Sequence, residues 1–375
     1  MKNKKLLILA IITITVILVA GIASKLRAPQ ITRSKDVLFP ELVNRINDVV
    51  AIDIKGSQRS VLLRQQDNIW VIGNADNYPA LFEKVKGTII HLSKLKILAE
   101  KTDNPELYSK LGVEDPGEKR AKSLLLTLRD KSNQKVASII VGAPRHSKSA
   151  NSSPGLYVRK PDTAQALLVE GSLNITDDTK NWFNRHILDI YASRLSEVSI
   201  QHPDGDELKI GKKTKEQPSF ELQDELVGGK GKSVFKIIFN RIGTALEEIN
   251  ADGVRSATQF TFPEDTVVTT FKTFDGLIIT AKCAMVNDKP YAQFSFNVDS
   301  AIIESSQENF ADEKMNVQEE ARILNDILSE WVYEIPEFKY EDLTKRKDSL
   351  TSIATPDLKN DPRRPINPLQ NLDFP

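Results

Sequence analysis

The chain has 375 residues, and its 51 Lys plus Arg side chains balance its 51 Asp plus Glu side chains, so the formal net charge is zero. Hydrophobic residues make up 40% of the sequence, which predicts a folded body with one large or two medium-sized cores. Nucleic-acid-binding proteins present a basic face, so this neutral, mixed charge argues against that class.

An apolar run near the N-terminus predicts a transmembrane anchor. Residues Leu6 to Ala23 are interrupted only by Thr13 and Thr15, and a helix of about 18 residues is roughly 27 Å long, close to the hydrocarbon thickness of a bilayer. A basic tail (1–5) precedes the anchor (6–23), and a linker (24–45) follows it.

A cleaved signal peptide is the alternative interpretation of this run, because Gly21-Ile22-Ala23 is an acceptable cleavage site. The run is longer than a usual signal core, and Lys25 and Arg27 follow it, so the anchor is favoured. Positive charges flank both ends in nearly equal number. A short basic tail directly before the run is typical of exported proteins, which predicts a single-pass inner-membrane protein with a periplasmic body.

The region after the linker predicts strands with one helix. Residues 49–54 and 60–63 form a hairpin pattern around Gly56-Ser57, and 68–72 is a third strand. An amphipathic helix follows, because Leu81, Val85, Ile89, Leu92 and Leu95 recur with the helical period. Strands are then expected at 124–128, 136–141 and 156–158.

The second half repeats this pattern, which predicts an internal duplication. Strands are expected at 195–200, 208–210 and 219–222, with Phe220 in the place of Trp70, and a helical stripe follows from Val234 to Ile249. Three more strands are expected at 267–271, 277–281 and 291–294. The predicted fold is therefore α+β, with two similar strand-rich lobes at 46–190 and 191–336. Chance similarity between two α+β halves is the alternative.

Three further segments have distinct patterns. Asp178 to Leu188 is predicted to be a short joining helix, in which Arg185 and His186 are interpreted as structural. A last amphipathic helix is expected near Glu313 to Tyr333, ended by Pro336. The range 337–375, which is rich in proline and charge from Thr344 onward, is predicted to be a disordered tail.

The sequence resembles the bacterial family named domain of unknown function 4340. The resemblance depends on the order and spacing of short motifs: Trp70-Val71, Tyr78-Pro79-Ala80, Leu107-Tyr108, Leu111-Gly112-Val113-Glu114-Asp115-Pro116, Gly155-Leu156-Tyr157-Val158-Arg159 and Trp182-Phe183-Asn184-Arg185. It covers about Val49 to Ile200 well and the second half more loosely. It implies a membrane-anchored envelope component, and some relatives accompany auxiliary ABC-type transport systems of the gliding-motility kind. No catalytic residues carry over.

The physical interpretation of these motifs is structural. Pro79 suits the first turn of a helix, Gly112 suits a left-handed residue that ends the helical segment from Pro105 to Lys110, and Trp70 and Trp182 suit core positions.

We find no catalytic, cofactor or metal constellation in the sequence, so no site residues and no cofactors are predicted. Cys283, the one cysteine, lies in an apolar alternating segment and is interpreted as a core residue. The four histidines, His91, His146, His186 and His202, show no metal-ligand spacing. Asp204-Gly205-Asp206 is interpreted as a hairpin turn rather than a calcium loop. Gly231-Lys232-Ser233 lacks the earlier glycine of a phosphate-binding loop, because Leu226 is in that position.

Two function classes are left. The first, which is favoured, is a non-enzymatic accessory or scaffold component of a transport or envelope assembly, with an ABC-type transporter or another envelope protein as partner. The second is an envelope hydrolase whose active site forms between the lobes. A deep pocket that gathers carboxylates would favour the hydrolase, and an exposed apolar patch would favour the scaffold.

Overall fold

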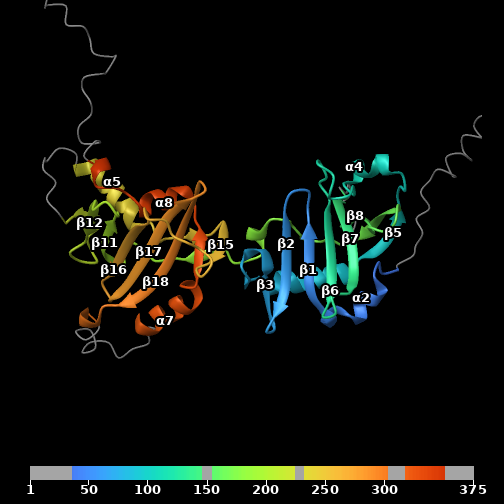
Figure 1. Cartoon of the computed structure of the whole chain (residues 1–375), viewed down its shortest axis with the longest axis horizontal. Coiled ribbons are helices and arrows are strands. Elements are labelled where there is room, and N and C mark those ends of the chain that lie inside the picture. The colour runs from blue at the N-terminus through green and yellow to red at the C-terminus, as the bar shows by residue number, and fades with distance from the viewer. Residues whose placement is uncertain (1–35, 146–153, 224–231, 303–316, 351–375) are drawn as a thin grey trace, which may run out of the picture. The chain divides into compact units, whose positions relative to one another are not determined.

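The computed structural model describes residues 36–145, 154–223, 232–302 and 317–350 (Figure 1). The chain divides into two compact units, Met1–Asn184 and Arg185–Pro375. Each unit contains one large antiparallel sheet and few helices, so the predicted α+β class is confirmed.

The first unit contains a nine-stranded sheet in the order β4-β3-β2-β1-β6-β7-β8-β9-β5. Its strands are β1 (Val49–Lys55), β2 (Ser60–Gln66), β3 (Ile69–Ile72), β4 (Tyr78–Pro79), β5 (Lys96–Glu100), β6 (Leu124–Asp130), β7 (Lys135–Pro144), β8 (Gly155–Arg159) and β9 (Ala166–Glu170). Its α-helices are α2 (Pro40–Asn44), α3 (Phe82–Ser93) and α4 (Tyr108–Leu111), and its 3-10 helices are η1 (Ile46–Asp48), η2 (Gly73–Ala75), η3 (Pro105–Leu107) and η4 (Thr179–Asn181).

The alternation of side chains along β1 gives this sheet two different faces. Ile52 lies opposite Leu63 of β2 and Leu128 of β6, and all three are fully buried. Asp53, the next residue, points to the other face, where it lies 2.6 Å from Arg64 and 3.2 Å from Arg129. The buried face is the core of the unit, and the predicted stripe of α3 is buried at Val85, Ile89 and Leu92.

The second unit contains an eight-stranded sheet in the order β13-β12-β11-β16-β17-β18-β19-β15 and a separate β10-β14 pair. Its strands are β10 (His186–Leu188), β11 (Leu195–Gln201), β12 (Glu207–Gly211), β13 (Glu221–Leu222), β14 (Ile249–Asn250), β15 (Gly253–Ser256), β16 (Val267–Thr273), β17 (Leu277–Val286), β18 (Lys289–Val298) and β19 (Trp331–Glu334). Its helices are α5 (Lys232–Gly243), α7 (Val317–Leu328) and α8 (Glu337–Leu343).

The core of the second unit is a row of side chains across the middle strands. Val198, Phe271, Ile279 and Phe296 lie opposite one another along four successive strands, and each is at most 1% exposed. Helix α7 packs on β18, where the Asn325 side-chain amide accepts a hydrogen bond from the backbone N–H of Phe296 at 2.9 Å. Helices α5 and α8 contact each other (Figure 1).

The two large sheets share an order of eight strands. The order β3-β2-β1-β6-β7-β8-β9-β5 corresponds strand by strand to β13-β12-β11-β16-β17-β18-β19-β15, with β4 as an addition in the first sheet. A helix follows the third strand in both, α3 in one and α5 in the other. The registers agree as well, because a bulge follows Val49 in β1 and Leu195 in β11.

The predicted joining helix from Asp178 to Leu188 is wrong. Helix η4 is a single turn, with the side chain of Asp178 accepting the backbone N–H of Lys180 at 3.3 Å. The chain then extends, and β10 pairs with β14. Pairing with another strand supplies the backbone hydrogen bonds of residues 186–188, so they have no need of a helix. Pro79 also lies outside the predicted helix start, in β4 opposite Val71.

The end of the chain differs from the prediction in two ways. The last amphipathic helix ends at Leu328 rather than Tyr333, since Trp331 begins β19, which pairs with β15 and β18. Residues 337–343 form α8, and Leu350 is fully buried. The predicted disordered tail is therefore wrong for 337–350, because α8 and Leu350 bury apolar side chains. The rest of that range, 351–375, lies outside the described residues.

No helix in the described part of the chain is both long enough and apolar enough to cross a membrane. The predicted anchor from Leu6 to Ala23 lies outside that part of the chain.

Candidate functional site

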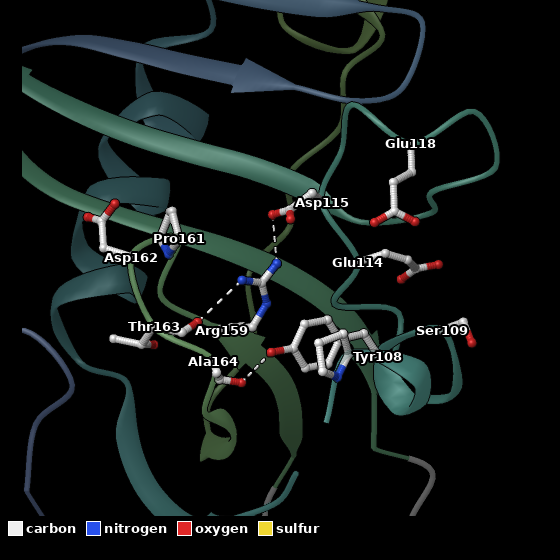
Figure 2. A pocket seen from close by; sticks show the side chains of 11 residues that line it. Tyr108, Ser109, Glu114, Asp115, Glu118, Arg159, Pro161, Asp162, Thr163 and Ala164 are labelled. Atoms are coloured by element: carbon white, nitrogen blue, oxygen red, sulfur yellow. Dashed lines mark hydrogen bonds and ion pairs between the residues drawn. The ribbon is translucent and has the colours of Figure 1, made fainter. Parts of the chain in front are cut away.

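A pocket of about 550 Å³ in the first unit is the strongest candidate site (Figure 2). It forms where α4 and the loop after it meet the turn that joins β8 to β9. Its lining is Pro105, Tyr108, Ser109, Glu114, Asp115, Glu118, Arg159, Pro161, Asp162, Thr163 and Ala164.

Local sequence signals explain why the wall around α4 has this shape. The side chain of Asn104 caps η3 by accepting the backbone N–H of Glu106 at 3.0 Å, and Pro105 occupies the first turn. Helix α4 ends at Gly112, which has a φ of +67° and donates its N–H to the carbonyl of Tyr108. The predicted left-handed role of Gly112 is confirmed.

A second glycine lets this loop lie directly on the sheet. A Cβ atom on Gly142 of β7 would lie 2.5 Å from the carbonyl oxygen of Leu111 and 2.7 Å from that of Gly112. Both contacts are with backbone atoms, so a side chain at Gly142 would displace the loop. The glycine at this position therefore allows the loop after α4 to contact β7.

Arg159, at the end of β8, holds the pocket together. Its side chain is only 5% exposed. Its Nε donates to the carbonyl of Val113 at 3.1 Å, one terminal nitrogen donates to the carbonyl of Thr163 at 3.3 Å, and the other lies 2.7 Å from the carboxylate of Asp115. A guanidinium with donors on three sides suits this clamping role.

Tyr108 forms the apolar side of the clamp. Its ring lies 4.5 Å from the central carbon of the Arg159 guanidinium, a cation–π distance. Its hydroxyl donates to the carbonyl of Ala164 at 2.5 Å, as Figure 2 shows. Tyr108 also packs in a small core cluster with Val113, Ile140 and Ala166.

The pocket carries more negative than positive charge. Glu114, Asp115, Glu118 and Asp162 line it, whereas Arg159 is its one cation among the lining residues. One carboxylate oxygen of Glu114, Oε2, is buried and has no hydrogen-bond partner among the residues that the structure describes. The described residues contain no group of three His, Cys, Asp or Glu side chains that could hold a metal ion. The arrangement can accept hydrogen bonds from a ligand that carries donors.

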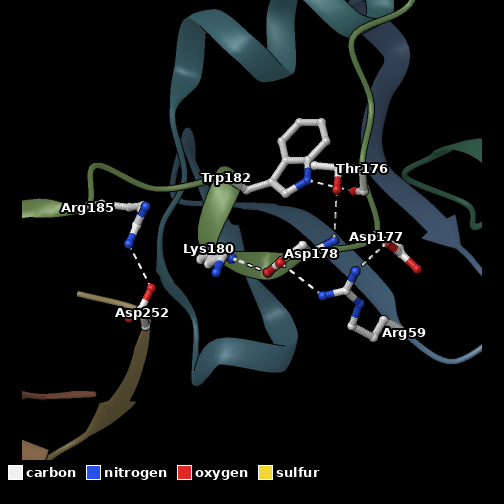
Figure 3. Close-up of polar contacts among 8 residues, drawn as sticks. All are labelled: Arg59, Thr176, Asp177, Asp178, Lys180, Trp182, Arg185 and Asp252. Carbon is white, nitrogen blue, oxygen red and sulfur yellow. Dashed lines mark hydrogen bonds and ion pairs between the residues drawn. The ribbon is translucent and has the colours of Figure 1, made fainter. Parts of the chain in front are cut away.

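The two tryptophans interpreted as core residues are both buried, Trp70 at 5% and Trp182 at 0% exposure. The indole Nε1 of Trp182 donates to the carbonyl of Thr176 at 3.0 Å (Figure 3), and the ammonium of Lys84 lies 4.5 Å from the ring. Burial lowers the pKa of Lys84.

The acidic pair Asp177-Asp178 contacts Arg59 in the hairpin turn between β1 and β2 (Figure 3). The guanidinium of Arg59 lies 2.9 Å from Asp178 and 3.4 Å from Asp177. The pair therefore fastens this turn to the end of the first unit.

Arg185 makes structural contacts in the second unit. Its Nε donates to the carbonyl of Ala251 at 3.0 Å, and its other end lies 2.7 Å from Asp252. His186 is part of β10.

Cys283 is fully buried in β17, and burial raises the pKa of its thiol to about 12. A thiol that stays protonated is a poor nucleophile, which agrees with its interpretation as a core residue.

Asp204 and Asp206 belong to a hairpin turn with Gly205 at a φ of +92°, and Arg346 pairs with both carboxylates. His146 lies outside the described residues.

The motifs that carry the family resemblance meet around this pocket, and nothing in the sequence predicts that contact. Tyr108, the segment 111–116 and the segment 155–159 were each interpreted separately as structural. Arg159 brings them together, because it contacts Tyr108, Val113 and Asp115. The available signal was a single charged residue at the end of the apolar strand Gly155-Leu156-Tyr157-Val158.

The fold and the pocket define a class of α+β proteins with two large antiparallel sheets of shared strand order and an arginine-clamped pocket on the first. The chain belongs to the family described as Domain of unknown function (DUF4340), which matches residues 70–265, more than half of the sequence. This match confirms the resemblance. Neither a curated protein nor a solved structure matches the chain.

Proposed function

We propose that this protein is a single-pass, membrane-anchored envelope component that acts as a scaffold or accessory subunit of a transport or envelope assembly. The apolar run from Leu6 to Ala23 would hold it in the inner membrane, with the body on the periplasmic side. An ABC-type transporter is the partner class that we would look for first, because of the family resemblance.

The observation that carries the proposal is the strand order shared by the two sheets. We infer that the two units arose by duplication, with Trp70 and Phe220 as equivalent core residues. Arg64 lies opposite Ala51, the first paired residue after the β1 bulge, and also opposite Val71 of β3. Gly211 likewise lies opposite Glu197, the first paired residue after the β11 bulge, and opposite Glu221 of β13. Trp70 directly precedes Val71, and Phe220 directly precedes Glu221. Two copies of one module in tandem suit a protein that offers two related surfaces to an assembly.

The contacts of Arg159 support a binding role for the pocket rather than a catalytic one. All three nitrogens of its guanidinium contact groups of the protein itself. An arginine engaged in this way fixes the shape of a surface, and a fixed surface loses little conformational entropy when a partner binds.

Affinity purification tests the proposal. The full-length chain, extracted from membranes in mild detergent, would be captured and its co-purifying proteins identified by quantitative mass spectrometry. A matched variant lacking 351–375 reports on the tail, and Gly142→Leu, which displaces the loop beside the pocket, reports on the first unit. We expect specific recovery of transporter or envelope subunits with the full-length chain.

Either of two results would count against this function. Recovery of nothing above background would contradict the proposed scaffold role. Release of the full-length chain from membranes by alkaline carbonate would contradict the proposed transmembrane anchor. Periplasmic exposure of the body can be checked by protease treatment of intact and of outer-membrane-permeabilised cells, which should cleave it only after permeabilisation.

The envelope hydrolase retains one supporting observation, which is the buried Oε2 atom of Glu114 without a hydrogen-bond partner in the described part of the chain. Such an oxygen can accept a hydrogen bond from a polar group of a substrate. A screen of glycan and ester substrates with the full-length chain and its Glu114→Gln variant tests this alternative, since only activity that the variant loses would support it.

A further inference from the structure

A second, smaller pocket lies elsewhere in the first unit and has a different chemistry. Its volume is about 270 Å³, at the small end for ligand sites. We call it the Leu156 pocket. It shares no lining residue with the Arg159 pocket.

The interior of the Leu156 pocket is apolar. Leu124 and Val141 lie directly opposite each other in the β6–β7 ladder, and Leu156 lies opposite Pro144 in the β7–β8 ladder. Leu173 and Ile175, from the segment after β9, close the pocket. Leu156 and Val141 are buried, whereas Leu124, Leu173 and Ile175 are half-buried, so the pocket keeps apolar surface accessible to a ligand.

A bulge in β7 lies beside this pocket. The ladder passes from Val141 opposite Val158 to Pro144 opposite Leu156, so β7 has one more residue than β8 between these pairs. Bulges often occur beside binding sites, where they redirect side chains. Here the bulge lies between Val141 and Pro144, which both line the pocket.

The charged side chains that line this pocket, within the described ranges, are both cations. Lys122 is exposed two residues before Leu124, and Arg145 follows directly after β7. The backbone N–H of Arg145 donates to the carbonyl of Gly155 at 2.7 Å. A Cβ atom on Gly155 would lie 3.2 Å from the Nε of Arg145, so the absence of a side chain at Gly155 leaves room for the guanidinium.

We propose that the Leu156 pocket binds an anionic amphiphile, an apolar chain that ends in a carboxylate or a phosphate. The apolar side chains would take the chain, and Lys122 and Arg145 would contact the anionic end. A peptide fits less well, because its backbone needs hydrogen-bond partners and the lining includes Pro144 and Pro154, which have no amide hydrogen.

Photolabelling of the full-length chain tests this binding site. The chain would be placed in nanodiscs of zwitterionic phosphatidylcholine and irradiated with decanoic acid that carries a diazirine near its methyl end. We expect mass spectrometry to find the label on the peptides that contain 154–156 or 173–175. Unlabelled decanoate and decyl phosphate should compete, and decyltrimethylammonium should not.

Charge-reversal variants give a second test of the proposed binding site. Lys122→Glu should lower labelling about fivefold, the scale of one partly screened charge contact, and Arg145→Glu at least as much. Lys119→Glu is the matched control, because Lys119 is exposed three residues before Lys122 in sequence and does not line the pocket. Because Lys122 is exposed, its variant should fold normally, which a chemical unfolding curve checks.

Four results would overturn the proposal, and the first three come from the labelling pattern, the competitors and the variants. They are labelling outside these peptides, equal competition by decyltrimethylammonium, and labelling that neither charge variant reduces. Competition by inorganic phosphate as strong as that by decyl phosphate would reduce the pocket to a simple anion site and would also overturn it.

Discussion

The guanidinium of Arg159 lies 2.7 Å from the carboxylate of Asp115 and thereby joins two parts of the chain that are 44 residues apart in sequence. The two residues differ in exposure, with Arg159 at 5% and Asp115 at 65% of the side chain. We therefore expect substitution of the buried Arg159 to lower the free energy of unfolding more than substitution of the exposed Asp115.

Arg159→Ala should lower the free energy of unfolding by about 2–3 kcal/mol, because the carbonyls of Val113 and Thr163 lose their donors in a partly buried place. Arg159→Lys should recover only part of this loss, since an ammonium cannot replace three directed contacts. Asp115→Asn should cost at most about 1 kcal/mol, as expected for an exposed carboxylate. Urea unfolding of the three variants measures the order, and a larger loss for Asp115→Asn than for Arg159→Ala would contradict the clamp.

Trp70→Ala should lower the free energy of unfolding by about 3–5 kcal/mol, because its ring is 5% exposed and the substitution leaves a cavity. The neighbouring residue supplies the control. Ile69 is 57% exposed, so Ile69→Ala should change stability by less than about 0.5 kcal/mol. If both substitutions had the same effect in thermal or urea unfolding, the contrast between a buried Trp70 and an exposed Ile69 would be wrong.

Gly112→Ala should destabilise the protein by about 1–2 kcal/mol, because an alanine at a φ of +67° is strained and its Cβ atom would lie 3.2 Å from the backbone nitrogen of Ala143. Gly117 lies in the same loop region, and a Cβ atom there would meet nothing within 4 Å. Gly117→Ala should therefore be close to neutral. Comparable losses in the two variants would show that the left-handed conformation at Gly112 is not the cause.

Local patterns in the sequence predicted most of the elements that a single segment can specify. The hairpins, the α3 stripe and the Gly112 cap depend on neighbouring residues, and they are present. The failures concern segments whose partners are distant in sequence. Residues 186–188 and 331–334 became strands because β14, β15 and β18 pair with them, and no local period reports such pairing.

The two candidate pockets also depend on contacts between segments that are distant in sequence. The family resemblance places Tyr108 and Arg159 in separate motifs, but their contact joins segments that are distant in sequence and no local pattern reports it. The Leu156 pocket depends on one extra residue in β7, which alternation alone does not locate.

A pH dependence should arise from Asp342 in α8. Burial raises the pKa of its carboxyl, although Arg241 at 2.8 Å opposes this shift. The folded state then holds this proton at a higher pH than the unfolded state, so the contribution of Asp342 to stability falls as pH rises from about 4, its ordinary pKa, through the raised value. Asp342→Asn removes this dependence.

The measurement is the difference in free energy of unfolding between the wild type and Asp342→Asn, taken at several pH values from 4 to 7. This difference should decrease with rising pH and then level off. Glu337→Gln, at an exposed position in the first turn of α8, is the control for a general charge effect. A difference that grows with pH would mean that the ion pair with Arg241 outweighs the burial.

Two C-terminal truncations separate the structured end of the second unit from the residues beyond it. Removal of 344–375 takes away Leu350, which is fully buried, and Arg346, which pairs with Asp204 and Asp206. This truncation should cost about 2–4 kcal/mol, the usual loss for a buried leucine. Removal of 351–375 alone takes away no contact among the described residues, and the melting temperature should stay close to that of the full chain. Leu350→Ala in the full-length chain should reproduce most of the loss from the longer truncation. If that truncation left stability unchanged, residues 344–350 would not be an integral part of the second unit.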